Sequence, residues 1–154
     1  LAFVATLWAV ALGIPIGIYS AVKQYSVFDY GGMVLAMLLF AMPSFWLGLM
    51  LILIFASTLK LLPTSGMVNI RKGYTGWAYV RDVAQHMVLP CATLVAVQIP
   101  SYFRITRSSV MQVMAEDFVT TFRVTGMSER KIFNKYILKN ALLPIVTVFG
   151  TWLM

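Results

Sequence analysis

Four stretches without charged residues divide the chain, and they constrain its fold more than any other feature. They cover residues 1–22, 30–59, 83–103 and 140–154. About 20 apolar residues cross the ~30 Å hydrocarbon core of a bilayer, so the first three are long enough, and the fourth is if it continues. Lipid offers no hydrogen-bond partners to the backbone, so membrane spans of this kind are helical. The sequence therefore predicts an all-α, polytopic transmembrane helical bundle, with residues 1–154 forming one domain.

Composition and charge point to the same class of protein. Hydrophobic residues make up 60% of the chain and charged residues 11%, against about 25% charged residues in soluble domains. The net charge of +7 collects between the apolar stretches, which is typical of a basic cytoplasmic face and not of a nucleic-acid groove. We therefore expect membrane lipid around the chain and no nucleic-acid partner. Because the chain starts at Leu1 and ends in an apolar run, we expect a fragment that lacks the N-terminal and C-terminal parts of a longer subunit.

The distribution of Lys and Arg predicts an orientation in a cell membrane. The linkers 23–29 and 104–139 share one side, and the linker 60–82 lies on the other. The first side carries eight basic residues: Lys23, Arg104, Arg107, Arg123, Arg130, Lys131, Lys135 and Lys139. The second side carries four: Lys60, Arg71, Lys72 and Arg81. By the positive-inside rule, residues 104–139 are cytoplasmic.

Small residues recur at every fourth position of the first span. They are Ala5, Ala9, Gly13, Gly17 and Ala21. Residues spaced by four lie on one face of a helix, and small side chains let a neighbouring membrane helix approach closely. The spacing therefore predicts a tight helix–helix contact along this face.

The long cytoplasmic segment 104–139, called the insert below, has the pattern of two amphipathic helices. Apolar residues at intervals of four predict the first helix over residues 105–125: Val110, Met114, Phe118 and Phe122. Gly126 offers the left-handed conformation that ends many helices, and Ser128 is placed to cap a second helix with Glu129 in its first turn. A hairpin resting on lipid headgroups and a docking element for a cytoplasmic partner both fit this pattern.

The segment "TRSSVMQVMAEDFVTTFRVTGMSERKIFNKYILKNALLPIVTVFG", residues 106–150, adds a specific resemblance. It is similar to the cytoplasmic loop of binding-protein-dependent ABC transporter permeases of the dipeptide, oligopeptide and nickel branch. Three other segments agree with the same family: "GIPIGIYSAVKQYSVFD" (13–29), "MPSFWLGLMLILIF" (42–55) and "LPTSG" (62–66). The resemblance covers most of the chain.

This resemblance implies a permease subunit of an ABC importer for di- or oligopeptides, with nickel or another small solute as the alternative. It implies ATP-binding cassette subunits that hydrolyse ATP, a second homologous permease and an extracytoplasmic substrate-binding protein as partners. No catalytic residue, metal or cofactor is expected in the chain itself. A non-transporting membrane scaffold is the alternative of another class. A membrane enzyme is disfavoured because the insert contains no histidine or cysteine.

The resemblance also implies which residues form the loop that couples the permease to its ATPase. Asp117 and Gly126 match recognisable positions of the family motif, and its exit into the next span matches Asn140, Ala141 and Pro144. Side-chain chemistry adds three further candidates. Glu116 offers a second negative charge to a basic partner, and Phe118 and Phe122 offer apolar anchors. The chain departs from the family at Thr120, Thr121, Phe122, Val124 and Thr125, where Glu-Ala-Ala, an alanine and a lysine are usual.

Two polar residues of the third span are candidates for a specific role. Gln98 is expected to form an interhelical hydrogen bond or to line a pathway. His86 is the single histidine of the chain, and a hydrogen-bonded or interfacial role is more typical of such a residue than nickel binding, because selective metal sites need several ligands.

Overall fold

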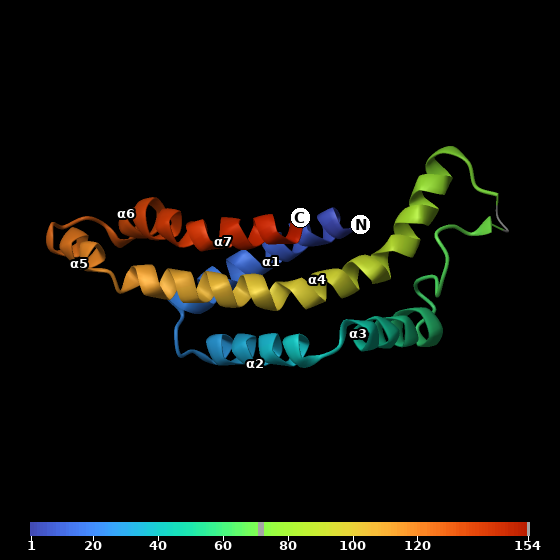
Figure 1. The fold of residues 1–154 in the computed structure, drawn as a ribbon, viewed down its shortest axis with the longest axis horizontal. Coiled ribbons are helices and arrows are strands. Elements are labelled where there is room, and N and C mark those ends of the chain that lie inside the picture. Colours follow the sequence, from blue (N-terminus) through green and yellow to red (C-terminus); the bar gives the residue numbers. More distant parts are fainter. Residues whose placement is uncertain (71–72, 154) are drawn as a thin grey trace.

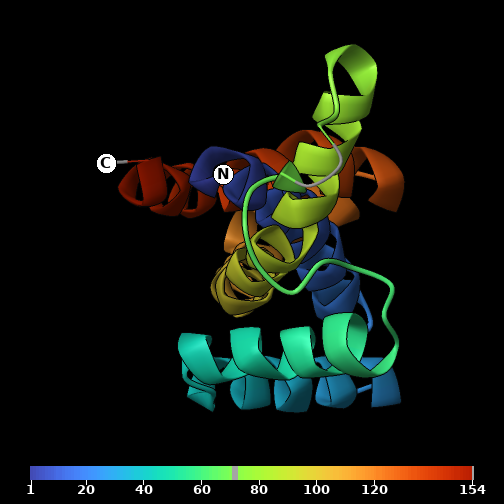
Figure 2. The ribbon, with the colours of Figure 1, turned by 90° about the vertical axis from the view of Figure 1, so that its right-hand side faces the viewer.

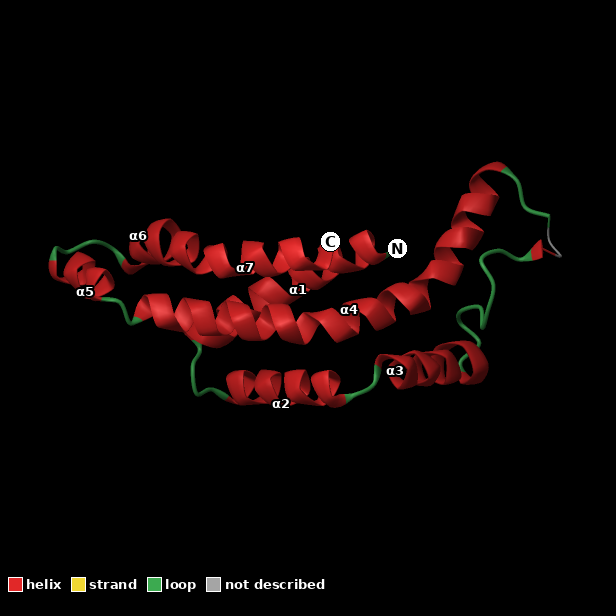
Figure 3. Ribbon diagram, in the orientation of Figure 1, coloured by secondary structure: helices red, strands yellow, loops and turns green. Residues whose placement is uncertain are grey.

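The structure is a computed structural model, and it describes residues 1–70 and 73–153. Two of the charges assigned to the linker 60–82, Arg71 and Lys72, lie outside the described residues, as does Met154 at the end of the predicted fourth span. The described residues contain helices and loops and no strand (Figure 3). The all-α prediction is confirmed.

Three helices form the centre of the molecule (Figure 1). α1 (Ala2–Val22) packs along α4 (Gly76–Met114), and α7 (Leu138–Leu153) lies against both. Apolar residues dominate all of α1 and α7, as expected of segments that face lipid and other helices instead of water.

The predicted contact along the small-residue face of α1 is confirmed. All five of its small residues are buried. A Cβ atom added to Gly13 would lie 2.7 Å from the Cβ atom of Tyr102, and one added to Gly17 would lie 2.8 Å from the carbonyl oxygen of Phe103. The backbones of α1 and α4 therefore touch, and any larger side chain at these two glycines would push them apart.

The predicted span 30–59 is wrong as a single helix. α2 (Val27–Ala41) is followed by α3 (Ser44–Leu51), which continues into the π-helical segment η1 (Ile52–Thr58). The two parts meet at an angle of 102°. The cause is Pro43, which has no N–H for the helix and excludes its predecessor from the α-helical region; Met42 is accordingly extended (φ −77°, ψ 129°). Both parts lie on the side of α4 away from α7 (Figure 2).

The predicted boundaries of the third and fourth spans are also corrected. α4 begins before residue 83 and continues through Arg104 and Arg107 to Met114. The last span likewise belongs to a helical run that starts with α6 (Glu129–Ile132), passes through the π-helical segment η3 (Phe133–Ile137) and continues into α7. Charged residues mark where a helix leaves the hydrocarbon, but Arg and Lys are good helix formers and do not end it.

By length and apolar character, α1, α4 and the run from α6 to α7 can each cross a membrane, and the bent pair of α2 and α3 forms a fourth span if it counts as one. The turn from α1 to α2 and the loops around α5 (Asp117–Val124) lie toward one end of the molecule. The long loop between η1 and α4 lies at the other end (Figure 3). The linkers 23–29 and 104–139 are thus on one side, as predicted.

The predicted helix over residues 105–125 is broken. α4 ends at Met114 and α5 starts at Asp117, with Glu116 extended between them (φ −70°, ψ 146°). The break turns α5 so that Val119 is fully buried. Burial of this side chain, which did not belong to the four-residue pattern, stabilises the bent arrangement over a continuous helix.

Candidate functional site

The insert is fixed to the transmembrane helices by one buried apolar cluster, called the base cluster below. It contains Ala21, Val110, Val119, Ile132, Ile137 and Ala141. These residues come from α1, α4, α5, α6, η3 and α7, so every helical element of the insert is packed on the ends of the three central helices. The structure therefore shows the insert as part of the bundle, packed against the ends of α1, α4 and α7.

Three aromatic side chains extend the base cluster along α5. The rings of Phe118 and Phe122 lie edge to face with 5.8 Å between centroids, and Phe122 lies 4.4 Å from the ring of Tyr136 in η3. Phe118 and Phe122 were expected as anchors for a partner. Both are half-buried, because part of each side chain packs against other residues of this chain. The fully buried anchor of α5 is Val119, which the sequence pattern missed because only the helix break brings it to the inside.

Gly126 ends α5 as predicted. Its φ of +79° lies in the left-handed region that favours glycine. Its N–H donates to the carbonyl oxygen of Arg123 (3.0 Å), and the N–H of Met127 donates to that of Phe122 (3.1 Å), which together form a Schellman motif. Ser128 precedes α6 at the predicted N-cap position, but its side chain makes no capping hydrogen bond.

An ion pair that sequence analysis missed crosses the Gly126 turn. Arg123 donates to both carboxylate oxygens of Glu129, from Nε at 2.7 Å and from Nη2 at 3.2 Å. The carboxylate raises the pKa of Arg123. The two side chains are 43% and 67% exposed, and exposed pairs contribute little to stability. The pair thus orients α5 relative to α6 without being a main source of stability.

The outer face of the insert remains free in this chain. Its exposed residues include Glu116, Asp117, Thr120, Thr121, Val124, Thr125, Gly126 and Ser128. The two acids lie at the N-terminal end of α5, where the helix dipole favours negative charge, and Val124 is an apolar side chain with 84% of its surface exposed. Of the five departures from the family motif, Phe122 alone is turned inward, against Tyr136, and the other four lie on this free face.

The exit from the insert follows the helical run into α7. Ala141 is buried in the base cluster, whereas Asn140 and Pro144 are exposed. Pro144 lies inside α7 without ending it. The structure therefore brings Ala141 together with Val119 of α5 but leaves Asn140 and Pro144 on the surface of this chain.

The two candidate polar residues of the third span, Gln98 and His86, have different surroundings. Gln98 is 4% exposed, and its side-chain oxygen has no hydrogen-bond partner among the described residues, so this atom does not form the predicted interhelical bond. Nδ1 of His86 donates to the carbonyl oxygen of Asp82 at 2.8 Å, which fits a hydrogen-bonded histidine. In residues 1–70 and 73–153, no three His, Cys, Asp or Glu side chains are grouped to hold a metal ion.

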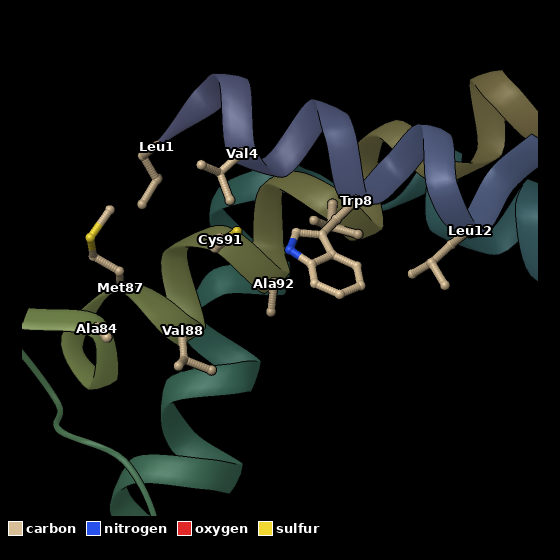
Figure 4. A pocket seen from close by; sticks show the side chains of 10 residues that line it. Leu1, Val4, Trp8, Leu12, Ala84, Met87, Val88, Cys91 and Ala92 are labelled. Atoms are coloured by element: carbon tan, nitrogen blue, oxygen red, sulfur yellow. The ribbon is translucent and has the colours of Figure 1, made fainter. Parts of the chain in front are cut away.

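An apolar groove with a volume of about 460 Å³ lies between the N-terminal halves of α1 and α4 (Figure 4). Val4, Trp8 and Leu12 line it from α1, and Val88 and Cys91 line it from α4. Such a wall is almost wholly apolar and offers few polar groups to orient a peptide. Cys91 is half-buried at this groove.

A buried acid is a further feature that sequence analysis missed. Asp29, in the first turn of α2, has no exposed surface. Nε and Nη2 of Arg107 donate to its two carboxylate oxygens at 2.6 and 2.8 Å. Charged residues in linkers are expected to be solvated, and no local pattern links two residues that are 78 positions apart.

Comparison with known proteins identifies the family. The oligopeptide transport system permease protein AppB of Bacillus subtilis (strain 168) is 34% identical over 150 residues, which is 97% of this chain and 46% of the relative. The dipeptide transport system permease protein DppB of Escherichia coli (strain K12) is 34% identical over 163 residues, 95% of this chain and 48% of the relative. The di/tripeptide permease DppB of Pseudomonas aeruginosa (strain UCBPP-PA14) is 33% identical over 164 residues, 97% of this chain and 49% of the relative.

The chain thus spans about half the length of the curated relatives it matches. The family described as "Binding-protein-dependent transport system inner membrane component" matches residues 13–154, nearly the whole chain. Together with helices long and apolar enough to cross a bilayer, this match shows that the chain is a membrane protein and belongs to that family of transport components.

Proposed function

We propose that the chain is part of a permease subunit of an ABC importer that moves di- or oligopeptides across the cell membrane. ATP is hydrolysed on separate ATP-binding cassette subunits. Family membership supports transport, and the names of the relatives support peptides as the substrate class. The observation that carries the proposal is the base cluster, because it joins an exposed insert to the ends of three membrane helices.

The insert is the docking element for the ATPase in this proposal. The exposed Glu116 and Asp117 face basic groups of the partner, the exposed edges of Phe118 and Phe122 supply apolar contact, and the turn at Gly126 and Ser128 sets the angle of α5. Val119 and Ile132 then pass movement to Val110 and Ala141 within the base cluster. Asn140 and Pro144 lie where the insert leads into α7.

The proposal includes two further partners, a second permease and a substrate-binding protein. A second homologous permease completes the pathway, and the exposed apolar faces of α1 and α2 suit contact with its helices and with lipid. An extracytoplasmic substrate-binding protein docks at the end that carries the loop between η1 and α4. Gln98 is a pathway residue only if the complete transporter opens the contact in which it is buried.

Reversing the charge at Asp117 tests the docking role. In the full-length permease co-expressed with its ATPase, we expect Asp117→Lys to reduce both the ATPase that co-purifies and peptide uptake by about tenfold, because a buried interfacial charge of the wrong sign is costly. Gln24→Lys, which adds a positive charge at an exposed position of the α1–α2 turn, is the matched control and should change neither. Wild-type association and uptake in Asp117→Lys would show that α5 is not the docking element.

The orientation is tested by cysteine labelling in a variant with Cys91→Ala. A membrane-impermeant maleimide should label Ser128→Cys only when the cytoplasmic side is opened. It should label Ser65→Cys in intact cells, because the exposed Ser65 lies in the loop at the opposite end. Labelling of Ser128→Cys in intact cells would invert the proposed topology.

A further inference from the structure

The buried carboxylate of Asp29 joins three parts of the chain at the end that carries the insert. Besides the two hydrogen bonds from Arg107 of α4, it accepts one from the hydroxyl of Ser20 in α1 and one from the backbone N–H of Tyr25 (3.0 Å) in the α1–α2 turn. The N–H of Asp29 itself donates to the side chain of Ser26 at 3.2 Å, which caps α2. Every acceptor site of the carboxylate is thus used to fix α2 to α1 and α4.

At this end α2 also contacts α1 through Phe28, whose ring lies edge to face with that of Tyr19 at 4.8 Å between centroids. Of the residues of α2, only Asp29 and Ala36 are buried. An apolar contact with α4 lies about one turn further along α2, where a Cβ atom on Gly32 would lie 3.1 Å from the ring of Phe103. The Asp29–Arg107 pair therefore fixes the start of α2 to α4, and the Phe28–Tyr19 contact holds it against α1.

The pair lies next to the base cluster along both helices that it joins to α2. Ser20 precedes Ala21, and Arg107 lies about one turn before Val110 on α4. Ala21 and Val110 both contact the cluster that holds Val119 of α5. A movement of α5 thus reaches Arg107 through a short, continuously helical segment of α4.

We propose that Asp29 and Arg107 are positioning residues that make α2, and with it the bent span of α2 and α3, follow the movement of α5 during transport. This inference rests on the proposed function of the insert. A planar guanidinium bound through two nitrogen atoms fixes the direction as well as the distance of its partner. Stability alone does not require such a pair, because buried ion pairs can often be replaced by neutral side chains without loss of stability.

The test compares single and double neutral variants in the full-length permease with its ATPase and binding protein. Arg107→Gln leaves a buried carboxylate without its cation and should reduce the amount of folded protein. Asp29→Asn with Arg107→Gln removes both charges, so the amount of folded protein and the melting temperature should return toward wild type. We nevertheless expect peptide uptake per ATP hydrolysed to fall about threefold or more in the double variant, because α2 no longer follows α4.

Arg107→Lys provides a second test that keeps the charge and so does not depend on folding of the double variant. It loses the bidentate geometry and should also lower uptake per ATP. Lys23→Gln removes an exposed charge from the same turn and should leave the ratio unchanged. A wild-type ratio in Arg107→Lys, or in a folded double variant, would overturn the positioning role. If the unmodified complex imports no peptide, the proposed function fails instead, so the two failures are distinguishable.

Discussion

Replacing Gly17 with alanine should lower the melting temperature of the detergent-solubilised protein sharply and reduce the amount that reaches the membrane. The new Cβ atom would lie 2.8 Å from both the carbonyl oxygen of Phe103 and the Cβ atom of Thr106. One of these contacts is with backbone, so no rotamer change relieves it and α1 must move away from α4. Overpacking of this kind costs about 1–3 kcal/mol, and Gly17→Leu should prevent folding altogether.

Gly31 provides the matched control for this prediction. It lies within α2, and a Cβ atom added there would meet nothing within 4 Å. Gly31→Ala should therefore leave the melting temperature unchanged or slightly raised, since alanine favours the helix. Equal melting temperatures for Gly17→Ala and Gly31→Ala would show that α1 and α4 are not in backbone contact.

Replacing Gly126 with proline should abolish peptide uptake and co-purification of the ATPase. Proline fixes φ near −65°, whereas Gly126 has φ +79°, and it removes the N–H that donates to Arg123. The Schellman motif is then lost, and α5 can no longer be held at its angle to α6. Uptake by the reconstituted complex and the ATPase content of the purified complex are the measurements.

Gly126→Asn separates the backbone requirement from the side chain. A Cβ atom on Gly126 would meet nothing within 4 Å in this chain, and asparagine tolerates the left-handed region better than other non-glycine residues. We expect this variant to keep most of the association and uptake. If asparagine were as damaging as proline, the cause would be direct contact between this turn and a partner, and not its backbone conformation.

The features predicted correctly from the sequence are those with a local physical cause. The face of α1 that carries Gly13 and Gly17 was predicted because helical spacing alone places small residues on one line. The turn at Gly126 was predicted because one residue type tolerates its conformation. Both depend on residues close together in the chain.

The features missed depend on residues that are distant in the chain or on packing. The break between α4 and α5 occurs at Ala115 and Glu116, two good helix formers, and it accompanies the burial of Val119 in the base cluster. The pairing of Asp29 with Arg107 was missed because charges in linkers are normally solvated. The continuity of the third span with the helix predicted from residue 105 was missed because charge indicates the limit of the hydrocarbon and not the end of a helix.

The bend between α2 and α3 has a consequence for the lipid around the protein. Because residue 43 is proline, the carbonyl group of Leu39 lacks the donor that a regular helix would supply four residues later. In hydrocarbon an unpaired carbonyl costs several kcal/mol, and irregular backbone at membrane depth is tolerated where protein covers it or water reaches it. We therefore expect acyl chains to be excluded from this corner of the assembled transporter, and hydrophobic photolabels carried by lipid to react with Trp8 and Phe3 in preference to Met42.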